Sequence, residues 1–376
     1  MTKTTNLNKN ITFLISTLSG GGAEGVCVGM ANTFAQNGWN VDLVVLNLKN
    51  EAYLDRLSDE VNLVVLNING ARFSGLALLK YIYKNKVKKI LVFNYELSVV
   101  LVILQLILKL KLKIISRNIS TFSAKMKQFE QLSYWDKFVV GPLIRYFYHR
   151  VNYVVNQSKG MRDDLINLYP HLVNTTNVIF NPIPAHLIDY ANKNDLSQIK
   201  KENYLLCIGR LEKLKGFHHA IKAFAGISNK YPYLRLKIVG KGSQEKNLKQ
   251  IAKDYSVLDR VDFEGFKKDI IPYYLHARVT ILPSLYEGYP NVLIESISMN
   301  TPVIAFDCPS GPNEIIIDGR NGYLVKNQDV EDLRKKMLNF PYDKFVYRDL
   351  VNSIKQNHIQ KVFKHYEDTI NFYVQN

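Results

Sequence analysis

The chain has 376 residues, 47% of them hydrophobic, and a formal charge of +16. This length exceeds what one hydrophobic core usually spans, so we expect two domains with sizeable cores. The three cysteines form no CxxC pair and no histidine cluster accompanies them, which excludes a disulfide framework and a zinc site. We interpret them as small buried groups in a reducing compartment.

The positive charge is concentrated between residues 80 and 150, where 14 Lys and Arg stand against 3 Asp and Glu. Bulky apolar and aromatic side chains are mixed with these cations, which suits a helix lying on an anionic bilayer. A basic, solvated surface is the alternative. We expect no nucleic acid partner, because no zinc finger, RRM signature or helix-turn-helix is present. The polar N-terminus predicts no signal peptide, and the apolar window 97–108 is too short to span a membrane.

Strand and helix patterns alternate along the first half of the chain. The predicted strands are residues 11–15, 41–46, 61–66, 90–93, 112–116, 153–156 and 178–179. The predicted helices are residues 23–36, 76–83, 97–108 as a buried helix, 134–150 as an amphipathic helix, and 159–167. This alternation is typical of a parallel, doubly wound sheet. Residues 183–203 are polar, and prolines lie at positions 182 and 184, which predicts a linker.

A second alternating series follows. Its predicted strands are residues 204–208, 234–239, 261–263, 279–282, 301–306 and 322–325. Its predicted helices are residues 216–228, 248–254, 270–276 and one beginning at Pro290, with helical character from 328 onward interrupted only by Pro341. The predicted fold class is α/β, with two Rossmann-like doubly wound domains facing a central crevice. We place them at residues 1–184 and 185–350, and we expect residues 351–376 to form a helix that packs back on the first domain.

The stretch from residue 279 to 299 combines a buried strand, a tight loop and a helix. Glu287 and Gly288 lie in the loop, and Pro290 suits the first helical position because its missing N–H costs nothing there. Glu295 follows eight residues after Glu287, so both carboxylates can face the carboxyl edge of the sheet, where ligands bind. The alternative is a pair of acids favoured by the helix dipole, or for Glu295 a solvated helix residue.

Two cations lie at another predicted strand end. Arg210 directly follows Gly209, and Lys215 lies at the mouth of the next helix, where both could bind a diphosphate. A surface pair is the alternative. The glycine loop at Gly240 is a weaker signal of the same kind. The chain contains no Asp-x-Asp sequence, so we expect no metal, with positive side chains and helix dipoles in its place.

Three consecutive glycines, including Gly21 and Gly22, connect the first predicted strand to its helix. Backbone N–H groups there would point at the helix mouth, which is a natural anion or sugar site. A tight turn without function is the alternative. Further candidates in the first domain also follow strand ends: Glu96 after residue 93, and Arg117 with Asn118 after residue 116. For Glu96, a simple acid at a helix N-terminus is as good an interpretation.

These motifs together resemble GT-B glycosyltransferases of family 4, which are retaining enzymes that use nucleotide sugars. The matching stretches are GRLEKLKG at 209–216, VGKGSQ at 239–244, FEGF at 263–266, EGYPNVLIE with its Glu-x7-Glu spacing at 287–295, GGGAE at 20–24, NPI at 181–183 and CPSGPNE at 308–314. The resemblance covers nearly the whole chain and is strongest from 204 to 326.

The resemblance implies roles for the site residues. Arg210 and Lys215 would bind the donor diphosphate, Glu287 would contact the donor sugar, and Glu295 the ribose hydroxyls. Backbone N–H groups near the helix mouth would add to the phosphate site, the strand-end loops would lie near the nucleotide, and glycines of the first domain would approach the phosphate or the acceptor. These groups are Gly209, Gly240, Gly265, Phe266, Lys267, Gly288, Tyr289, Asn291, Val292, Gly21 and Gly22. Glu96, Arg117 and Asn118 would lie on the acceptor side.

The resemblance therefore predicts a retaining, metal-independent glycosyltransferase without a cofactor. It would move a hexose or N-acetylhexosamine from a nucleotide diphosphate sugar, with UDP the commonest carrier in the family, to a lipid-linked saccharide in surface polysaccharide or lipopolysaccharide assembly. We expect a cytoplasmic protein bound peripherally to the anionic cytoplasmic face of the inner membrane. The alternatives are a nucleotide-sugar epimerase or sugar phosphorylase on the same architecture, and a nucleotide-sugar-binding protein without catalysis.

Overall fold

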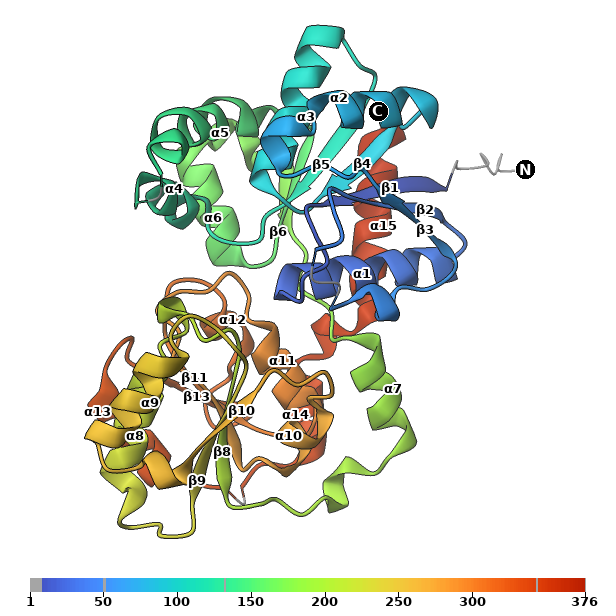
Figure 1. The fold of residues 1–376 in the computed structure, drawn as a ribbon. Helices are drawn as coiled ribbons and strands as arrows, with labels where there is room; N and C mark the ends of the chain where they lie inside the picture. Colours follow the sequence, from blue (N-terminus) through green and yellow to red (C-terminus); the bar gives the residue numbers. More distant parts are fainter. Residues whose placement is uncertain (1–8, 50–51, 132, 343, 376) are drawn as a thin grey trace. The chain divides into compact units, whose positions relative to one another are not determined.

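The computed structural model describes residues 9–49, 52–131, 133–342 and 344–375. The chain forms two compact units (Figure 1). Unit 1 comprises Met1–Pro182 and Ile359–Asn376, and unit 2 comprises Ile183–His358. Each contains one parallel sheet with helices on both faces, which confirms the predicted α/β class.

The sheet of unit 1 has seven strands in the order β3-β2-β1-β4-β5-β6-β7. The strands are β1 (Asn10–Ile15), β2 (Asn40–Val45), β3 (Val61–Val65), β4 (Lys89–Val92), β5 (Lys113–Arg117), β6 (Tyr153–Asn156) and β7 (Thr176–Val178). Strands β1 and β2 pair in register from Asn10 with Asn40 to Ile15 with Val45. The central strands are almost continuous apolar runs, as expected where helices cover both faces of a sheet.

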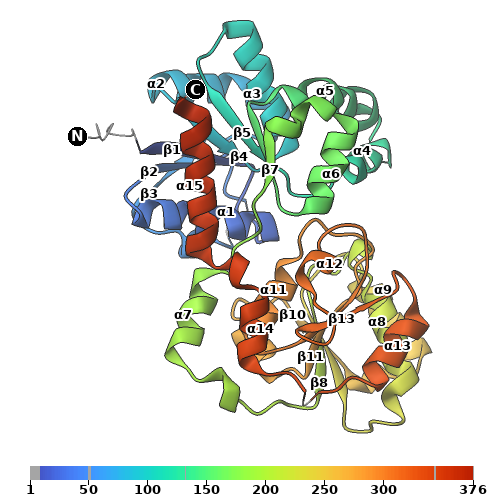
Figure 2. The same ribbon diagram turned by 180° about the vertical axis from the view of Figure 1, so that it is seen from behind.

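The helices of unit 1 are α1 (Gly22–Gln36), α2 (Gly75–Lys84), α3 (Tyr95–Leu108), α4 (Phe122–Gln131), α5 (Gly141–Phe147), α6 (Lys159–Leu168) and α15 (Ile359–Gln375). Helix α15 lies beside α1, far from it in sequence (Figure 2). Its side chains Val362, Phe363, Tyr366 and Ile370 are buried in the same core as α1. The C-terminal helix therefore completes one face of unit 1.

Three sequence predictions for unit 1 need correction. Helix α4 was not predicted, although Phe122, Met126 and Phe129 bury one of its faces. The predicted helix 134–150 contains a π-helix, Asp136–Val140, immediately before Gly141 and Pro142. Proline lacks the N–H that a regular α-helix needs at this point, which favours the local change of pitch. The predicted buried helix ends in exposed residues, because Ile107 is 71% exposed.

The sheet of unit 2 has six strands in the order β10-β9-β8-β11-β12-β13. The strands are β8 (Tyr204–Ile208), β9 (Arg235–Val239), β10 (Val261–Gly265), β11 (Val279–Leu282), β12 (Val303–Phe306) and β13 (Gly322–Val325). The helices are α7 (Ala185–Lys193), α8 (Phe217–Ser228), α9 (Glu245–Asp254), α10 (Ile271–His276), α11 (Asn291–Ser298), α12 (Pro312–Ile315), α13 (Val330–Leu338) and α14 (Tyr347–Ser353).

The predicted linker at 183–203 is wrong. This segment contains α7, which packs against α11, and it buries Leu187 and Leu196 completely. The prolines that suggested a linker lie before the helix, where Pro184 is the N-cap of α7. Proline at a helix start is compatible with helix formation, so this composition was misleading.

Candidate functional site

Glycine loops meet at the carboxyl edge of the unit 2 sheet. Gly240 follows β9 with φ +142°, and a Cβ there would lie 1.8 Å from the carbonyl oxygen of Gly209, which follows β8. The backbones are also joined by a hydrogen bond from the Leu211 N–H to the Lys241 carbonyl, at 2.9 Å. Only glycine at 240 allows this approach, so the two loops form one backbone-lined platform.

A third loop, residues 283–290 between β11 and α11, packs against the loop after β8. Gly216 has φ +63°, and a Cβ there would lie 2.0 Å from the Pro283 carbonyl oxygen. The Leu285 N–H donates to the Leu214 carbonyl at 2.9 Å. These contacts place Lys215 beside the loop that carries Glu287.

Lys215 and Glu287 form an ion pair, with 2.6 Å between Nζ and Oε1. The side chains are only 20% and 11% exposed. The aliphatic stem of Lys215 lies over Gly209, because a Cβ at 209 would be 3.9 Å from Lys215 Cδ. Arg210 is exposed, and among the residues described its guanidinium makes no hydrogen bond or ion pair. The structure thus brings Lys215, Glu287 and the backbone of Arg210 to one edge of the sheet.

Helix α11 begins at this edge. Pro290 is its N-cap and has extended backbone angles, so it lies one position earlier than predicted. No side chain caps the helix start, and the positive end of the helix dipole lies at this edge. In the second turn, Glu295 accepts a hydrogen bond from the Tyr274 hydroxyl at 2.9 Å. Since Tyr274 is fully buried, it fixes the Glu295 carboxylate in place.

The 283–290 loop has further supports that the sequence analysis missed. The Ser310 hydroxyl donates to the Gly288 carbonyl at 3.0 Å, and Gly311, with φ +90°, approaches Gly288 and Pro290 closely. Tyr289 is 4% exposed and its hydroxyl accepts from Asn357 Nδ2 at 2.8 Å. Burial raises the pKa of this phenol. Its side chain is therefore a structural anchor, and only its backbone faces the site. The CPSGP sequence was the available signal for the Ser310 contact.

Cys308 lies near the ion pair. Burial, and next the neighbouring Glu287 carboxylate, raise the pKa of the Cys308 thiol to about 12. A thiol with that pKa is not a nucleophile near neutral pH. Cys308 is therefore a packing residue.

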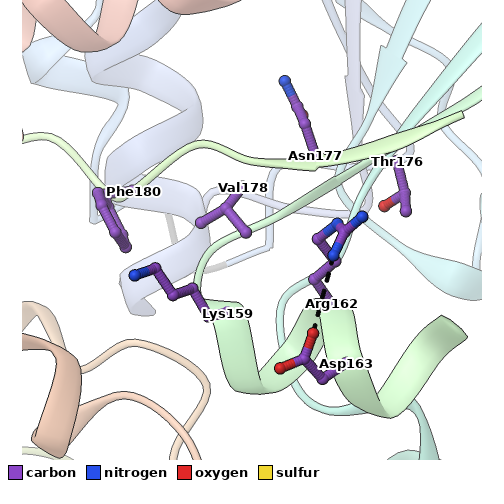
Figure 3. A pocket seen from close by; sticks show the side chains of 7 residues that line it. All are labelled: Lys159, Arg162, Asp163, Thr176, Asn177, Val178 and Phe180. Atoms are coloured by element: carbon purple, nitrogen blue, oxygen red, sulfur yellow. Dashed lines mark ion pairs between the residues drawn. The ribbon is translucent and has the colours of Figure 1, made fainter. Parts of the chain in front are cut away.

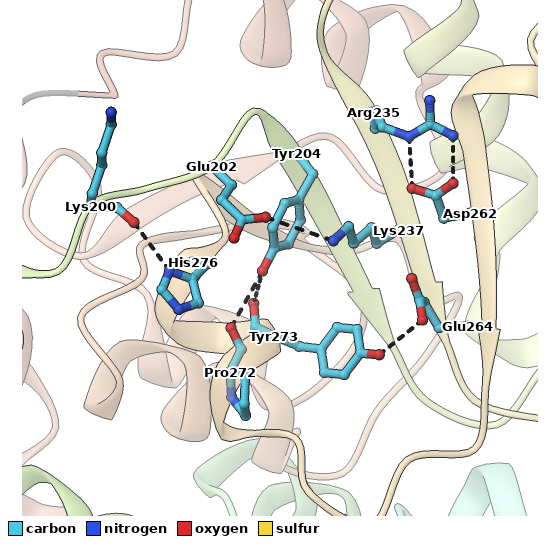
Figure 4. Close-up of polar contacts among 10 residues, drawn as sticks. All are labelled: Lys200, Glu202, Tyr204, Arg235, Lys237, Asp262, Glu264, Pro272, Tyr273 and His276. Atoms are coloured by element: carbon cyan, nitrogen blue, oxygen red, sulfur yellow. Dashed lines mark hydrogen bonds and ion pairs between the residues drawn. The ribbon is translucent and has the colours of Figure 1, made fainter.

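Three further predicted donor-side residues, 265–267, lie at the carboxyl end of β10. Gly265 has φ +70°, Phe266 is 55% exposed, and Lys267 Nζ lies 3.5 Å from Glu264 Oε2. Glu264 also accepts from the Tyr273 hydroxyl at 2.9 Å (Figure 4). These contacts hold the end of β10 and leave the Phe266 ring as an exposed apolar face.

In unit 1, the predicted glycine site also carries a negative charge. Gly21 is the N-cap of α1 and Gly22 its first residue. The Glu24 carboxylate covers Gly21, since a Cβ there would lie 2.4 Å from Glu24 Oε2. Glu96, in the first turn of α3, forms an ion pair of 3.3 Å with Lys125.

Arg117 and Asn118 are 2% and 1% exposed. Arg117 donates from Nε to the Tyr366 hydroxyl at 2.9 Å and from Nη2 to Asn181 Oδ1, and its guanidinium lies over the Phe93 ring. Asn118 Nδ2 donates to Asn156 Oδ1 at 2.7 Å. The structure does not bring either side chain to the surface of unit 1. Both hold β5 to its neighbours, a role that strand-end position alone could not distinguish from ligand binding.

An open pocket of about 550 Å³ in unit 1 was not predicted (Figure 3). It lies between α6 and the edge strand β7, and its lining residues are Lys159, Arg162, Asp163, Thr176, Asn177, Val178 and Phe180. Arg162 Nη1 lies 3.8 Å from Asp163 Oδ1, too far for a strong pair. Two cations against one acid give the pocket a positive balance. The available signal was the basic sequence SKGMR directly after a strand.

In the ranges that the structure describes, no group of three His, Cys, Asp or Glu could hold a metal ion. Across the same ranges, no helix combines the length and hydropathy required to cross a membrane.

Comparison with known proteins agrees with the geometry. Residues 190–360 match the family of glycosyl transferases group 1. An uncharacterized glycosyltransferase of Haemophilus influenzae is 28% identical over 332 residues, covering 87% of this chain and 89% of that protein. The GalNAc-alpha-(1->4)-GalNAc-alpha-(1->3)-diNAcBac-PP-undecaprenol alpha-1,4-N-acetyl-D-galactosaminyltransferase of Campylobacter jejuni is 27% identical over 360 residues, covering 92% of each chain.

A similar solved structure is Anabaena HepE in complex with UDP and glucose. It has a TM-score of 0.75 and 18% identity over 96% of this chain and 99% of that one, which shows the fold. The two parallel α/β units are those of the GT-B fold. Residues 190–360 therefore form a group 1 glycosyltransferase domain, and the chain is a glycosyltransferase.

Proposed function

We propose that this protein is a retaining, metal-independent glycosyltransferase of family 4. It transfers a hexose or N-acetylhexosamine from a UDP-sugar to a lipid-linked saccharide in surface polysaccharide or lipopolysaccharide assembly. The observation that carries the proposal is the Lys215–Glu287 pair beside the uncapped start of α11. A cation, a carboxylate and a helix N-terminus thus lie together at one edge of the unit 2 sheet.

Each group has a task in that reaction. The first-turn N–H groups of α11, Lys215 and Arg210 bind the donor diphosphate, and Glu287 accepts hydrogen bonds from the donor sugar. As the bond from the anomeric carbon to the diphosphate oxygen breaks, negative charge grows on the diphosphate, where fixed cations and dipoles stabilise it. The acceptor hydroxyl attacks from the leaving-group side and its proton passes to the released diphosphate, which preserves the anomeric configuration.

The acceptor part of the proposal has separate support. The Campylobacter relative is named for a saccharide carried on PP-undecaprenol. The positive balance of the unit 1 pocket, with Lys159 and Arg162, suits an anionic group such as the diphosphate of a lipid carrier. Exposed aromatic side chains beside Lys137 and Arg145 suit peripheral attachment to an anionic membrane.

Purified protein incubated with a panel of UDP-sugars and an undecaprenyl-diphosphate-linked saccharide tests the proposal. We expect a longer lipid-linked saccharide whose new linkage, read by NMR, keeps the donor's anomeric configuration, with turnover unaffected by EDTA. An inverted linkage, or loss of turnover in EDTA, contradicts the mechanism. A product still attached to the nucleotide identifies an epimerase, and free sugar phosphate identifies a phosphorylase.

Variants locate the activity in the site. Lys215→Met and Glu287→Gln should each reduce kcat by about a hundredfold or more, because each removes a group that acts on the developing charge or the sugar. Lys249→Met is the matched control, since Lys249 and Glu245 form an ion pair of the same 2.6 Å length on the outside of α9. Equal turnover in all three variants would refute the assignment.

A further inference from the structure

The 283–290 loop is held by contacts from several segments of unit 2. Two contacts come from the segments after neighbouring strands: the Lys215 ion pair and the Ser310 hydrogen bond to Gly288. Another comes from Asn357, 68 residues further along the chain, whose Nδ2 donates to the Tyr289 hydroxyl. Asn357 contributes nothing to the sheet edge itself, so its contact needs a separate explanation.

Asn357 occupies a special place in the chain. It is fully buried, and its carbonyl accepts the N–H of Ile183 at 2.8 Å. Ile183 is the first residue of unit 2, and residues 358 and 359 are where the chain leaves unit 2 for α15. The backbone of Asn357 therefore joins the two passages of the chain between the units, while its side chain reaches the loop at the start of α11.

We propose that Asn357 is a positioning residue for the donor site, acting through Tyr289. This inference rests on the proposed function, in which the 283–290 loop and α11 hold the donor diphosphate. The Asn357 amide fixes the Tyr289 ring, and the buried ring fixes the backbone of Gly288 to Asn291. Asn357 also couples donor binding to the order of the two chain passages at residues 183 and 358–359. Its side chain supports the 283–290 loop, and its carbonyl holds Ile183, so both depend on the position of one residue.

Tyr289→Phe and Asn357→Leu test the contact from either side. Tyr289→Phe removes only the hydroxyl, and Asn357→Leu keeps a side chain of similar size without hydrogen-bonding groups. Each variant should raise the calorimetric Kd for UDP roughly five- to tenfold, as for the loss of one buried hydrogen bond. The Kd of the double variant for UDP should be no higher than the higher of the two single-variant values, because both substitutions break the same contact. Additive losses would contradict the inference.

Asn321→Leu is the matched control. Asn321 is also fully buried in unit 2, and its Nδ2 donates to the Ile315 carbonyl and to Ser353 Oγ, neither of which belongs to the 283–290 loop. The Asn321→Leu variant should lower Tm as much as Asn357→Leu does and leave the Kd for UDP unchanged. An equal Kd in Asn357→Leu and wild type, with a lower Tm, would make Asn357 a purely structural residue.

Hydrogen exchange gives a readout that does not need a ligand. The amides of Gly288, Tyr289, Asn291 and Val292 should exchange faster in Asn357→Leu than in wild type, and not in Asn321→Leu. With UDP bound to wild type, the Ile183 amide should exchange more slowly, and Tyr289→Phe should abolish this change. If wild type binds no UDP, the proposed function fails, and the exchange of the same four amides alone decides the role of Asn357: unchanged exchange overturns it.

Discussion

A single buried lysine shows how a charged side chain can hold unit 2 together. Lys201 Nζ donates to the Leu275 carbonyl at 2.8 Å, the Asn300 carbonyl at 2.7 Å and Thr301 Oγ1 at 2.6 Å. These acceptors lie at or just beyond the C-terminal ends of α10 and α11, where a cation is favoured by the helix dipole. Three acceptors match the three N–H groups of an ammonium ion.

The same lysine makes stability depend on pH. Burial lowers the pKa of Lys201 to about 7, below its value of about 10.4 in an unfolded chain. Between these values the unfolded chain binds more protons, so the free energy of unfolding rises with pH above 7, by at most about 1.4 kcal/mol per unit. Urea unfolding measured at about pH 6, 7.5 and 9 should show this rise in the free energy of unfolding in wild type, and its loss in Lys201→Met.

The control for this prediction is Lys246→Met, which removes an exposed lysine from α9 and should keep the wild-type slope. Lys201→Met also leaves three acceptors without their donor, so it lowers stability at every pH. The slope is therefore the diagnostic quantity. A slope in Lys201→Met equal to that of wild type would show that another group titrates.

At the scale of elements, the irregular helix from residue 134 to 147 is the clearest exposed feature of unit 1. Tyr134 is 83%, Trp135 51%, Phe138 54% and Tyr146 59% exposed. Lys137 lies over the Phe138 ring and Arg150 over the Tyr146 ring. Exposed aromatic rings next to cations are what a helix at a membrane interface presents.

Trp135→Glu and Phe138→Glu should therefore weaken binding to vesicles that contain anionic lipid, each by about tenfold, because a carboxylate replaces an apolar contact and is repelled by the surface. Tyr233→Glu is the control, since Tyr233 is also 83% exposed but lies in unit 2. Flotation with vesicles of neutral and of anionic lipid measures the effect. Wild-type protein that stays soluble with both would remove the membrane proposal.

The elements also show what the sequence could predict. Strand β11 has the predicted bounds, since a short, largely β-branched run that ends at a proline is a local signal. Helix α7 was missed because its polar surface resembles a linker, and only Leu187 and its neighbours packing on α11 reveal it. The π-helix needs the combined effect of Pro142 and the packing of α4 and α5, which local patterns do not contain.

In the molecule as a whole, the site likewise combines features that local patterns predict with features that depend on contacts between distant segments. Strand-end positions in one sheet predicted that Lys215 and Glu287 lie at the same edge, but not that they form an ion pair. Arg117 also follows a strand, yet its partner Tyr366 lies 249 residues away on α15. The sequence predicted that a C-terminal helix packs back on the first domain, but not that its Tyr366 meets Arg117 and makes a candidate ligand a buried support. The individual contacts between distant segments are therefore what the sequence alone did not reveal.

The return of α15 to unit 1 leads to a final prediction. Phe363 is 5% exposed and meets Phe34 edge-on at 4.9 Å, and Phe34 in turn meets Trp39 at 5.2 Å. Phe363→Ala should lower the stability of unit 1 by about 3–5 kcal/mol through the cavity it leaves. Phe372→Ala, at a side chain 62% exposed on the same helix, should change it by less than about 0.5 kcal/mol.

Both tryptophans, Trp39 and Trp135, belong to unit 1, so tryptophan fluorescence during urea unfolding follows this unit selectively. UDP binding by unit 2 should persist in Phe363→Ala at urea concentrations where the fluorescence transition is complete. Simultaneous loss of both signals would mean that the two units unfold as one cooperative body.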